Sequence, residues 1–202
     1  IQKAFEKAVN DKNIVMKTFI TTLLLLLCLN SMAQNQLPDF SFEQIKMSNI
    51  TMPYRKATIA PVQGEKPAVV IYLHGGSSKG SDNTTQMNEP GIELIANYLQ
   101  SSHINALFLV PQCPKDKSWM GPMYPVLKSM IERYTTDNDA QPATADINKV
   151  YIFGGSMGGT GTWGMLSMYP DMFAAAMPVA GNPSQCVAEN VAHTPVFTVM
   201  GK

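Results

Sequence analysis

The stretch VYIFGGSMGGTGTW, residues 150–163, joins a short apolar run to a serine set among glycines. Residues 150–153 are β-branched or aromatic, which is typical of a buried strand. A flexible linker is also rich in glycine, but it would not follow directly on such a run. The pattern therefore predicts a sharp turn from a buried strand into a helix, with Ser156 in the turn.

The rest of the chain repeats the alternation of buried strands and helices. Further apolar runs of the same form lie at residues 66–76, 105–112, 173–181 and 194–201. Runs without a polar face suit parallel strands that are covered on both sides. Helical spacing of apolar residues follows Pro90 over 92–99 and recurs over 123–134. Residues 41–48 and 49–60 favour two leading antiparallel strands. Together these patterns predict a three-layer α/β sandwich with a mostly parallel central sheet.

Composition limits the class of protein. The chain has 202 residues, 45% of them hydrophobic, and a formal net charge of +0. This length suits one domain with a sizeable core. The absence of a lysine and arginine cluster in the sequence argues against a nucleic-acid partner. The sequence also lacks the H-E-x-x-H pattern and paired Cys/His spacings, so we expect no metal site.

The N-terminal region predicts export. A basic start at Met16 precedes an apolar run of about a dozen residues, and small residues then reach Ala33. This indicates a secretory signal over 16–33 rather than a buried helix, and a secreted or periplasmic protein. The run is shorter than the roughly 20 residues that span a bilayer, so no stable membrane anchor is expected after cleavage. Residues 1–15 are interpreted as mis-annotated upstream sequence, and 34–202 as the folded domain.

Two cysteines remain in the expected mature chain, Cys113 and Cys186. Export implies an oxidising compartment, in which one disulfide could form. Two buried free thiols fit the sequence equally well, because two cysteines do not make a disulfide framework.

The residues around Ser156 match G-x-S-x-G after a strand and before a helix. In that context the serine lies on a strained turn that exposes its hydroxyl as a nucleophile. Gly154 and Gly158 are then required because larger side chains would collide there. The alternative is an ordinary glycine-rich turn between a strand and a helix.

The sequence YLHGGSSKGSD, residues 72–82, supplies the expected partner of the serine. Acyl transfer needs two backbone N–H groups directed at the developing oxyanion. We predict that Met157, the residue after the nucleophile, gives one and that Gly76 gives the other. His74 is expected to brace this loop rather than to act as a base.

Residues 159–164 spell G-x-G-x-x-G, the pattern of a dinucleotide-binding turn. That turn must begin at the end of the strand and be followed by an acid about 20 residues later. Here the pattern begins after the strand has ended, and Ser184 stands where the acid is expected. We therefore expect no cofactor.

The base and the acid of a catalytic triad are harder to find. Asp171 and His193 follow Ser156 in the right order, but His193 comes directly before a predicted strand and Asp171 after the serine's helix. A strand of this length spans about 20 Å, which puts both at the edge of the sheet away from Ser156. His103 also precedes a strand. The prediction is that the triad Asp and His are not present in the chain, whose domain is incomplete at its C-terminus.

Four segments carry a family resemblance: LHGGSSKGSDN (73–83), VPQCPKDKSW (110–119), INKVYIFGGSMGGTGTW (147–163) and YPDMFAAAMPVAGN (169–182). Over roughly residues 50–202 the chain resembles secreted serine esterases related to polyhydroxybutyrate depolymerases and feruloyl esterases, which are often labelled predicted peptidases or prolyl-oligopeptidase-like hydrolases. The resemblance implies an α/β-hydrolase fold, Ser156 as nucleophile, and Gly76 and Met157 as oxyanion donors. It leaves two roles open for Trp119, a wall of the acyl or alcohol pocket and a packed loop anchor.

The sequence favours a serine carboxylesterase that acts on ester-decorated polysaccharide or a similar exported substrate. One alternative is a peptidase of the prolyl-oligopeptidase type, which is less favoured because we expect no β-propeller before the predicted domain. The other is an inactive binding module that keeps the fold without the chemistry.

Overall fold

The computed structural model describes residues 37–137 and 142–201. The predicted upstream residues 1–15 and the predicted signal over 16–33 lie outside these ranges. Within them, no helix combines the length and the apolar character needed to cross a membrane.

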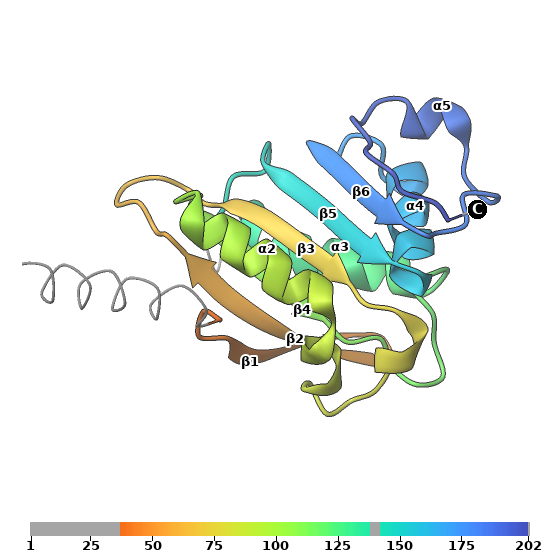
Figure 1. The fold of residues 1–202 in the computed structure, drawn as a ribbon, viewed down its shortest axis with the longest axis horizontal. Helices are drawn as coiled ribbons and strands as arrows, with labels where there is room; N and C mark the ends of the chain where they lie inside the picture. The colour runs from red at the N-terminus through yellow and green to blue at the C-terminus, as the bar shows by residue number, and fades with distance from the viewer. Residues whose placement is uncertain (1–36, 138–141, 202) are drawn as a thin grey trace, which may run out of the picture. The chain divides into compact units, whose positions relative to one another are not determined.

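One mixed sheet forms the centre of the described domain (Figure 1). Its strands are β1 (Ser41–Met47), β2 (Ile50–Ile59), β3 (Ala68–Leu73), β4 (Ala106–Pro111), β5 (Val150–Gly155) and β6 (Ala175–Val179). Their order is β1-β2-β4-β3-β5-β6. The pairs β4–β3, β3–β5 and β5–β6 are parallel, whereas β2 is antiparallel to both β1 and β4. The predicted mostly parallel sheet with two leading antiparallel strands is therefore confirmed.

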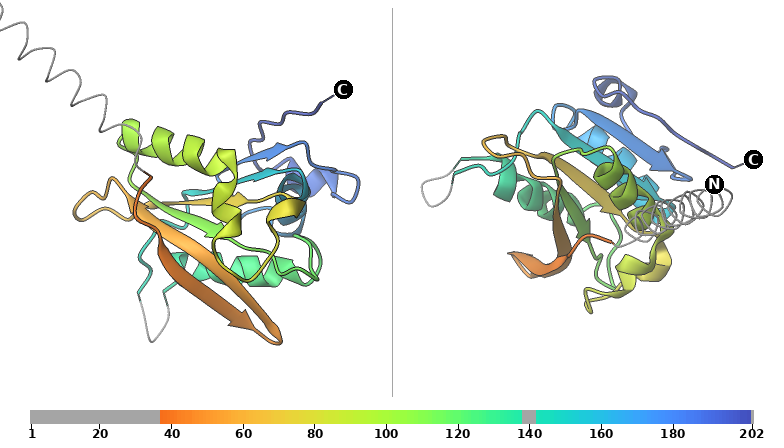
Figure 2. Two further views of the ribbon diagram at one scale, coloured as in Figure 1. Left: turned by 60° about the horizontal axis from the view of Figure 1, so that its bottom comes forward. Right: turned by 60° about the vertical axis from the view of Figure 1, so that its left-hand side comes forward.

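Helices cover both faces of the sheet and complete the predicted three layers (Figures 1 and 2). On one face lies α2 (Pro90–Ser101), which begins at the proline that the sequence indicated. On the other face lie α3 (Met123–Thr135) and α4 (Met157–Met168). The short helix α5 (Ala188–Val191) follows β6, and the 3₁₀ turns η1 (Gly76–Ser78) and η2 (Thr85–Asn88) lie between β3 and α2.

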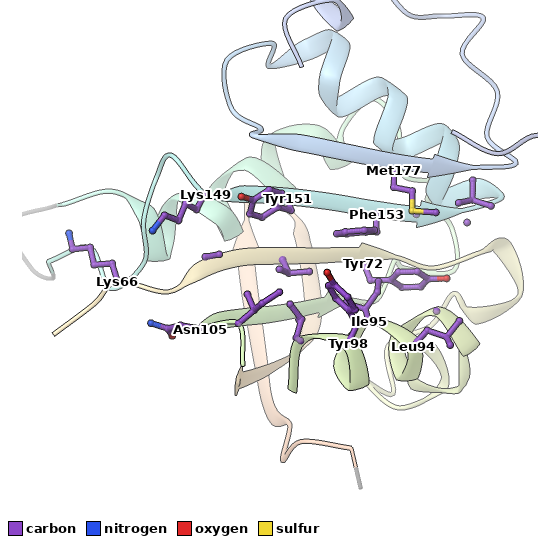
Figure 3. Close-up of a pocket in the computed structure, with 18 of the residues that line it drawn as sticks. Lys66, Tyr72, Leu94, Ile95, Tyr98, Asn105, Lys149, Tyr151, Phe153 and Met177 are labelled. Atoms are coloured by element: carbon purple, nitrogen blue, oxygen red, sulfur yellow. The ribbon is translucent and has the colours of Figure 1, made fainter. Parts of the chain in front are cut away.

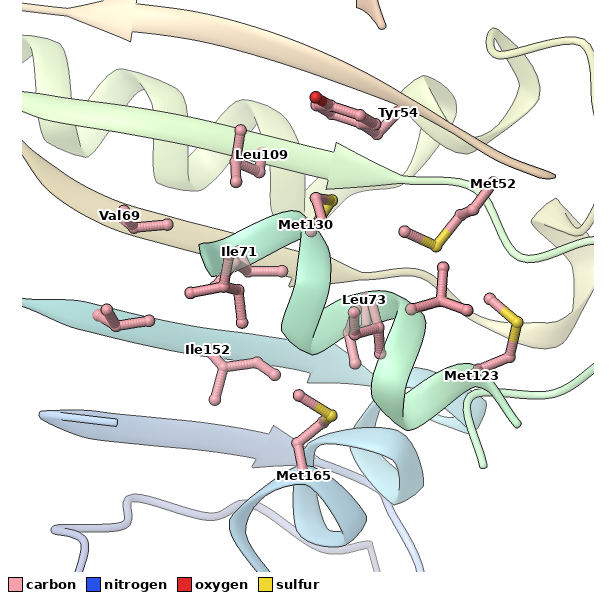
Figure 4. Packing of buried hydrophobic residues seen from close by; sticks show 14 of the residues in the cluster. Met52, Tyr54, Val69, Ile71, Leu73, Leu109, Met123, Met130, Ile152 and Met165 are labelled. Atoms are coloured by element: carbon pink, nitrogen blue, oxygen red, sulfur yellow. The ribbon is translucent and has the colours of Figure 1, made fainter. Parts of the chain in front are cut away.

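The larger hydrophobic core fills the space between the sheet and the helices α3 and α4 (Figure 4). Strand residues such as Ile71 and Ile152 pack there against Met130 of α3 and Met165 of α4. A second, smaller core lies between the sheet and α2. Each buried strand thus contributes apolar side chains to both faces, which explains why these strands read as continuous apolar runs in the sequence.

The last predicted strand, residues 194–201, forms only in part. Two isolated parallel bridges join this segment to β6, at Ala176–Val196 and at Val179–Val199. The N–H groups of Ala176 and Ala180 donate to Pro195 and Val199, but Pro178 lies between them on the same edge and has no N–H. The hydrogen-bond ladder is therefore interrupted where an ordinary residue would continue it.

Candidate active site

Ser156 occupies the junction between β5 and α4, as the glycine pattern predicted. Its backbone has φ 56° and ψ −115°, a region that residues with a side chain rarely adopt. Its own N–H donates to the carbonyl of Val179 in β6 at 2.9 Å, which fixes the turn to the neighbouring strand. The side chain is exposed. The strained turn thus holds an exposed serine at the junction of the strand and the helix.

Two glycines of the serine turn (residues 154–158), Gly154 and Gly158, stand where there is no room for a side chain. A Cβ atom on Gly158 would lie 1.8 Å from the carbonyl oxygen of Leu73 at the end of β3. A Cβ atom on Gly154 would lie 2.3 Å from the carbonyl oxygen of Gly158. Helix α4 therefore begins in direct backbone contact with the sheet, and this contact sets the position of Ser156.

The β3–α2 loop, residues 74–89, passes beside the serine. The position that a Cβ atom would take on Gly75 lies 3.9 Å from the Cβ atom of Ser156. Gly76 follows at the start of η1, and the space around its own Cβ position is open to 4 Å. The loop thus brings its backbone to the side of the exposed hydroxyl.

The two amides that the sequence selected have no acceptor among the described residues. Met157 is the first residue of α4, so its N–H has no partner within the helix. The N–H of Gly76 is likewise free of a hydrogen bond within the described ranges. Both groups are therefore available to a ligand atom beside Ser156.

His74 is a buried brace of the loop. Its Nε2 accepts the N–H of Cys113 at 2.9 Å, and its Nδ1 lies 2.6 Å from the carbonyl oxygen of Gly75. These contacts fit a neutral imidazole that carries its proton on Nδ1. Burial lowers the pKa of His74, which favours the same neutral form. Because both ring nitrogens are engaged, His74 is not free to take a proton from Ser156.

Trp119 requires a correction to the substrate-binding role predicted for it. The side chain has 0% exposure and belongs to the core between the sheet and α3. Its indole N–H donates to the carbonyl of His74 at 2.9 Å, and its ring meets the His74 ring edge-on with centroids 5.0 Å apart. Gly161 of α4 packs against it, since a Cβ atom there would lie 2.3 Å from that of Trp119. These contacts make Trp119 a loop anchor, the second of the two roles considered.

Cys113 and Cys186 are both free in this structure. Burial raises the pKa of the Cys113 thiol to about 12, so the group is neutral at ordinary pH. Its backbone N–H, rather than its thiol, takes part in the site through the contact with His74.

The other two histidines, His103 and His193, lie at the edge of the sheet away from Ser156. His193 and Asp171 approach each other at 3.9 Å, but Asp171 follows the end of α4 whereas Ser156 precedes its start. His103 follows α2 and precedes β4, so it lies at the edge of the sheet where the parallel strands begin. Among the described residues, no histidine is therefore placed to act on Ser156.

The β3–α2 loop contains a polar network that the sequence did not predict. Asp82 accepts the backbone N–H groups of Thr84 and Thr85 at 2.7 and 2.8 Å. These bonds hold the pKa of Asp82 well below its usual range. Gln112, fully buried after β4, donates to Asp82 and accepts the N–H of Asn83. Only the D-x-T-T spacing of residues 82–85, typical of a side-chain-capped turn, could have indicated part of it.

An apolar groove adjoins the serine turn on the α2 face of the sheet (Figure 3). Its volume is about 830 Å³. Apolar or aromatic side chains from the sheet and from α2 line it: Tyr72, Leu94, Ile95, Tyr98, Tyr151, Phe153 and Met177. Lys66 and Lys149 lie at one end of it (Figure 3). Gly154 and Gly155, the last residues of β5 and directly before Ser156, also line it.

The chain matches no model of a known protein family. Among curated proteins it is 34% identical over 74 residues to poly(3-hydroxyalkanoate) depolymerase C from Paucimonas lemoignei, a match that covers 37% of this chain and 16% of that protein. Among solved structures it is similar to a thermostable esterase, with 28% identity and a TM-score of 0.60 over 79% of this chain and 46% of that one. The chain has the α/β-hydrolase fold.

A second solved structure supports the same fold at lower identity. The feruloyl esterase module from Clostridium thermocellum, complexed with sinapinate, is 17% identical with a TM-score of 0.61 over 82% of this chain and 68% of that one. The resemblance to the esterases of this fold, predicted from the sequence, is confirmed by these neighbours. The chain spans less than half of the thermostable esterase and about a sixth of the depolymerase.

Proposed function

We propose that this protein is a serine hydrolase that cleaves carboxylic esters through an acyl-enzyme on Ser156. The observation that carries the proposal is the exposed Ser156 at φ 56° beside two free amides. One is the N–H of Gly76 in the neighbouring loop, and the other is the N–H of Met157, the residue after the serine. Neither has a hydrogen-bond partner among the described residues. Similarity to esterases of the same fold supports the class of reaction.

The chemistry follows from this arrangement. The Ser156 oxygen attacks the carbonyl carbon of the ester, and its proton passes to a general base. The N–H groups of Gly76 and Met157 donate to the oxyanion that forms, each worth about 3 kcal/mol of barrier in comparable sites. The alcohol leaves with a proton, and water then releases the acid and restores the serine. Since no described histidine is placed and free to take a proton from Ser156, the base and the acid of the triad are not assigned to described residues.

The proposed substrate is an ester carried on an exported polymer, ester-decorated polysaccharide first of all. The similarity to a poly(3-hydroxyalkanoate) depolymerase supports a polymer-associated ester as the class. The predicted secretory signal over 16–33 would place the enzyme where such polymers are found.

The test is hydrolysis of a p-nitrophenyl ester by the full-length protein and by its Ser156→Ala variant. We expect the variant to lose at least about a thousandfold in kcat, because the nucleophile carries the reaction. Ser101→Ala is the matched control, since Ser101 lies in the last turn of α2 and away from the serine turn. Equal activity of the Ser156→Ala variant and the wild type would contradict the proposal.

Two further measurements separate the alternative functions. A fluorophosphonate probe should label Ser156 of the active protein, and absence of labelling would favour a binding module. Amide turnover above ester turnover would favour a peptidase.

A further inference from the structure

Glu89 stands directly before α2 but does not cap that helix. The position before a helix favours serine, threonine, aspartate or asparagine, whose short side chains accept N–H groups of the first turn. Glu89 has the extended backbone of such a residue, with φ −70° and ψ 124°, yet its side chain makes no capping bond. Its carboxylate instead accepts hydrogen bonds from another segment.

That partner is the turn beside Ser156. One carboxylate oxygen, Oε1, accepts the N–H of Gly75 at 3.2 Å and the hydroxyl of Ser78 at 2.6 Å. Gly75 and Ser78 are also joined by a backbone bond of 3.3 Å, which closes the 3₁₀ turn η1 between them. A single oxygen atom thus holds both ends of the turn that begins with Gly76.

This contact decides which amide of the loop remains free. Glu89 occupies the N–H of Gly75, whereas the next N–H, that of Gly76, has no acceptor among the described residues. The Cβ position of Gly75 lies 3.5 Å from Glu89 Oε1 and 3.9 Å from the Cβ atom of Ser156. The carboxylate and the serine therefore both lie close to Gly75.

The charge of Glu89 is unfavourable for the chemistry itself. A carboxylate near a developing oxyanion opposes the negative charge of the transition state. The field of this carboxylate also reaches Tyr72, whose pKa is raised first by burial and second by Glu89. A negative side chain at this place is thus better explained by the hydrogen bonds it accepts than by its charge.

We infer that Glu89 is a positioning residue that holds the Gly76 amide toward the oxyanion. The inference rests on the proposed function, because it assigns a role within the same reaction. Glu89 acts through Gly75 and Ser78 and does not touch the substrate.

The experiment compares kcat and KM for a p-nitrophenyl ester in the full-length protein and its variants. Glu89→Ala removes both hydrogen bonds, and we expect kcat to fall about 10- to 100-fold with KM changed less than threefold. Glu89→Gln keeps an acceptor oxygen and loses the charge, so its kcat should stay within about threefold of the wild type. Glu93→Ala is the matched control, since Glu93 is an exposed carboxylate in the first turn of α2.

Ser78→Ala provides a second route that leaves Glu89 in place. It removes the shorter of the two contacts, and we expect kcat to fall about 3- to 10-fold. Combined with Glu89→Ala it should add little, because both variants release the same turn. This arm still tests the inference if Glu89→Ala does not fold.

The outcomes separate the two proposals. An unchanged kcat in Glu89→Ala and Ser78→Ala, with Ser156→Ala inactive, overturns the positioning role alone. An equal loss in Glu89→Gln and Glu89→Ala also overturns it, since the charge and not the hydrogen bonds would then matter. Full activity of Ser156→Ala overturns the proposed function itself.

Discussion

The serine turn and the β3–α2 loop meet at one point, but different forces hold them. The serine turn is fixed by backbone contacts that exclude side chains, as at Gly158, whose Cβ position lies 1.8 Å from the carbonyl oxygen of Leu73. The loop is fixed by side-chain hydrogen bonds: His74 of the loop accepts the N–H of Cys113 beyond β4, and Glu89 accepts the N–H of Gly75. Substitutions should therefore act sterically in the first region and through unsatisfied hydrogen bonds in the second.

The largest effect is expected for Gly158→Ala in the serine turn. The added methyl group would overlap the backbone of β3, and neither the strand nor α4 can move without disturbing the core. We expect the free energy of unfolding to fall by about 4 kcal/mol or more, measured by urea denaturation.

Gly76→Ala is the matched glycine substitution in the loop. The space around its Cβ position is open to 4 Å, so the expected loss of stability is below about 1 kcal/mol. Equal losses in the two variants would show that close backbone contact does not distinguish the two regions.

His74→Ala should have the largest effect in the loop. It leaves the buried N–H of Cys113 without an acceptor and opens a space beside Trp119. We expect a loss of about 2–3 kcal/mol in the free energy of unfolding. His193→Ala is the control, because that side chain is 62% exposed, and a loss as large as in His74→Ala would contradict the bracing role.

The pH dependence of stability tests the same brace without creating a cavity. The pKa of folded His74 lies below its ordinary value of about 6.5 because of burial, while nearby Glu89 raises it and Lys79 lowers it. Below pH 6.5 the unfolded chain binds a proton that the folded chain does not, so stability falls with falling pH, by at most about 1.4 kcal/mol per unit. Denaturation from pH 7.5 to 5 should show this slope in the wild type and not in His74→Gln.

The sequence predicted those parts of the fold that depend on neighbouring residues. Apolar runs located the buried strands β3 to β6, and helical spacing located α2 and α3, because each signal lies within one element. The partial pairing of residues 194–201 was not foreseen. It depends on Pro178, which belongs to the neighbouring strand and removes a donor from the shared ladder.

The candidate site divides in the same way. The turn at Ser156 could be predicted because the two positions that exclude a side chain, Gly154 and Gly158, lie within five residues of sequence. The burial of Trp119 and the contacts of Glu89 could not, since they depend on where distant segments meet. A glutamate before a helix carries no signal in the sequence for a hydrogen bond to Gly75, fourteen residues earlier.

The smallest effect is expected for Asp82→Ala, at the exposed side of the loop. The carboxylate accepts the N–H groups of Thr84 and Thr85, so its loss should speed hydrogen exchange of these two amides by roughly 3- to 10-fold. The same hydrogen bonds lower the pKa of Asp82 in the folded protein. Their protection of the two amides is therefore complete above the unfolded pKa of Asp82, near 4, and is lost as the pH falls through the lower folded pKa. Exchange at Ser156, whose N–H donates to the carbonyl of Val179, should stay unchanged, because the serine turn does not depend on the side chain of Asp82. Faster exchange there would mean that the loop and the turn open together, and the distinction between the two regions would then fail.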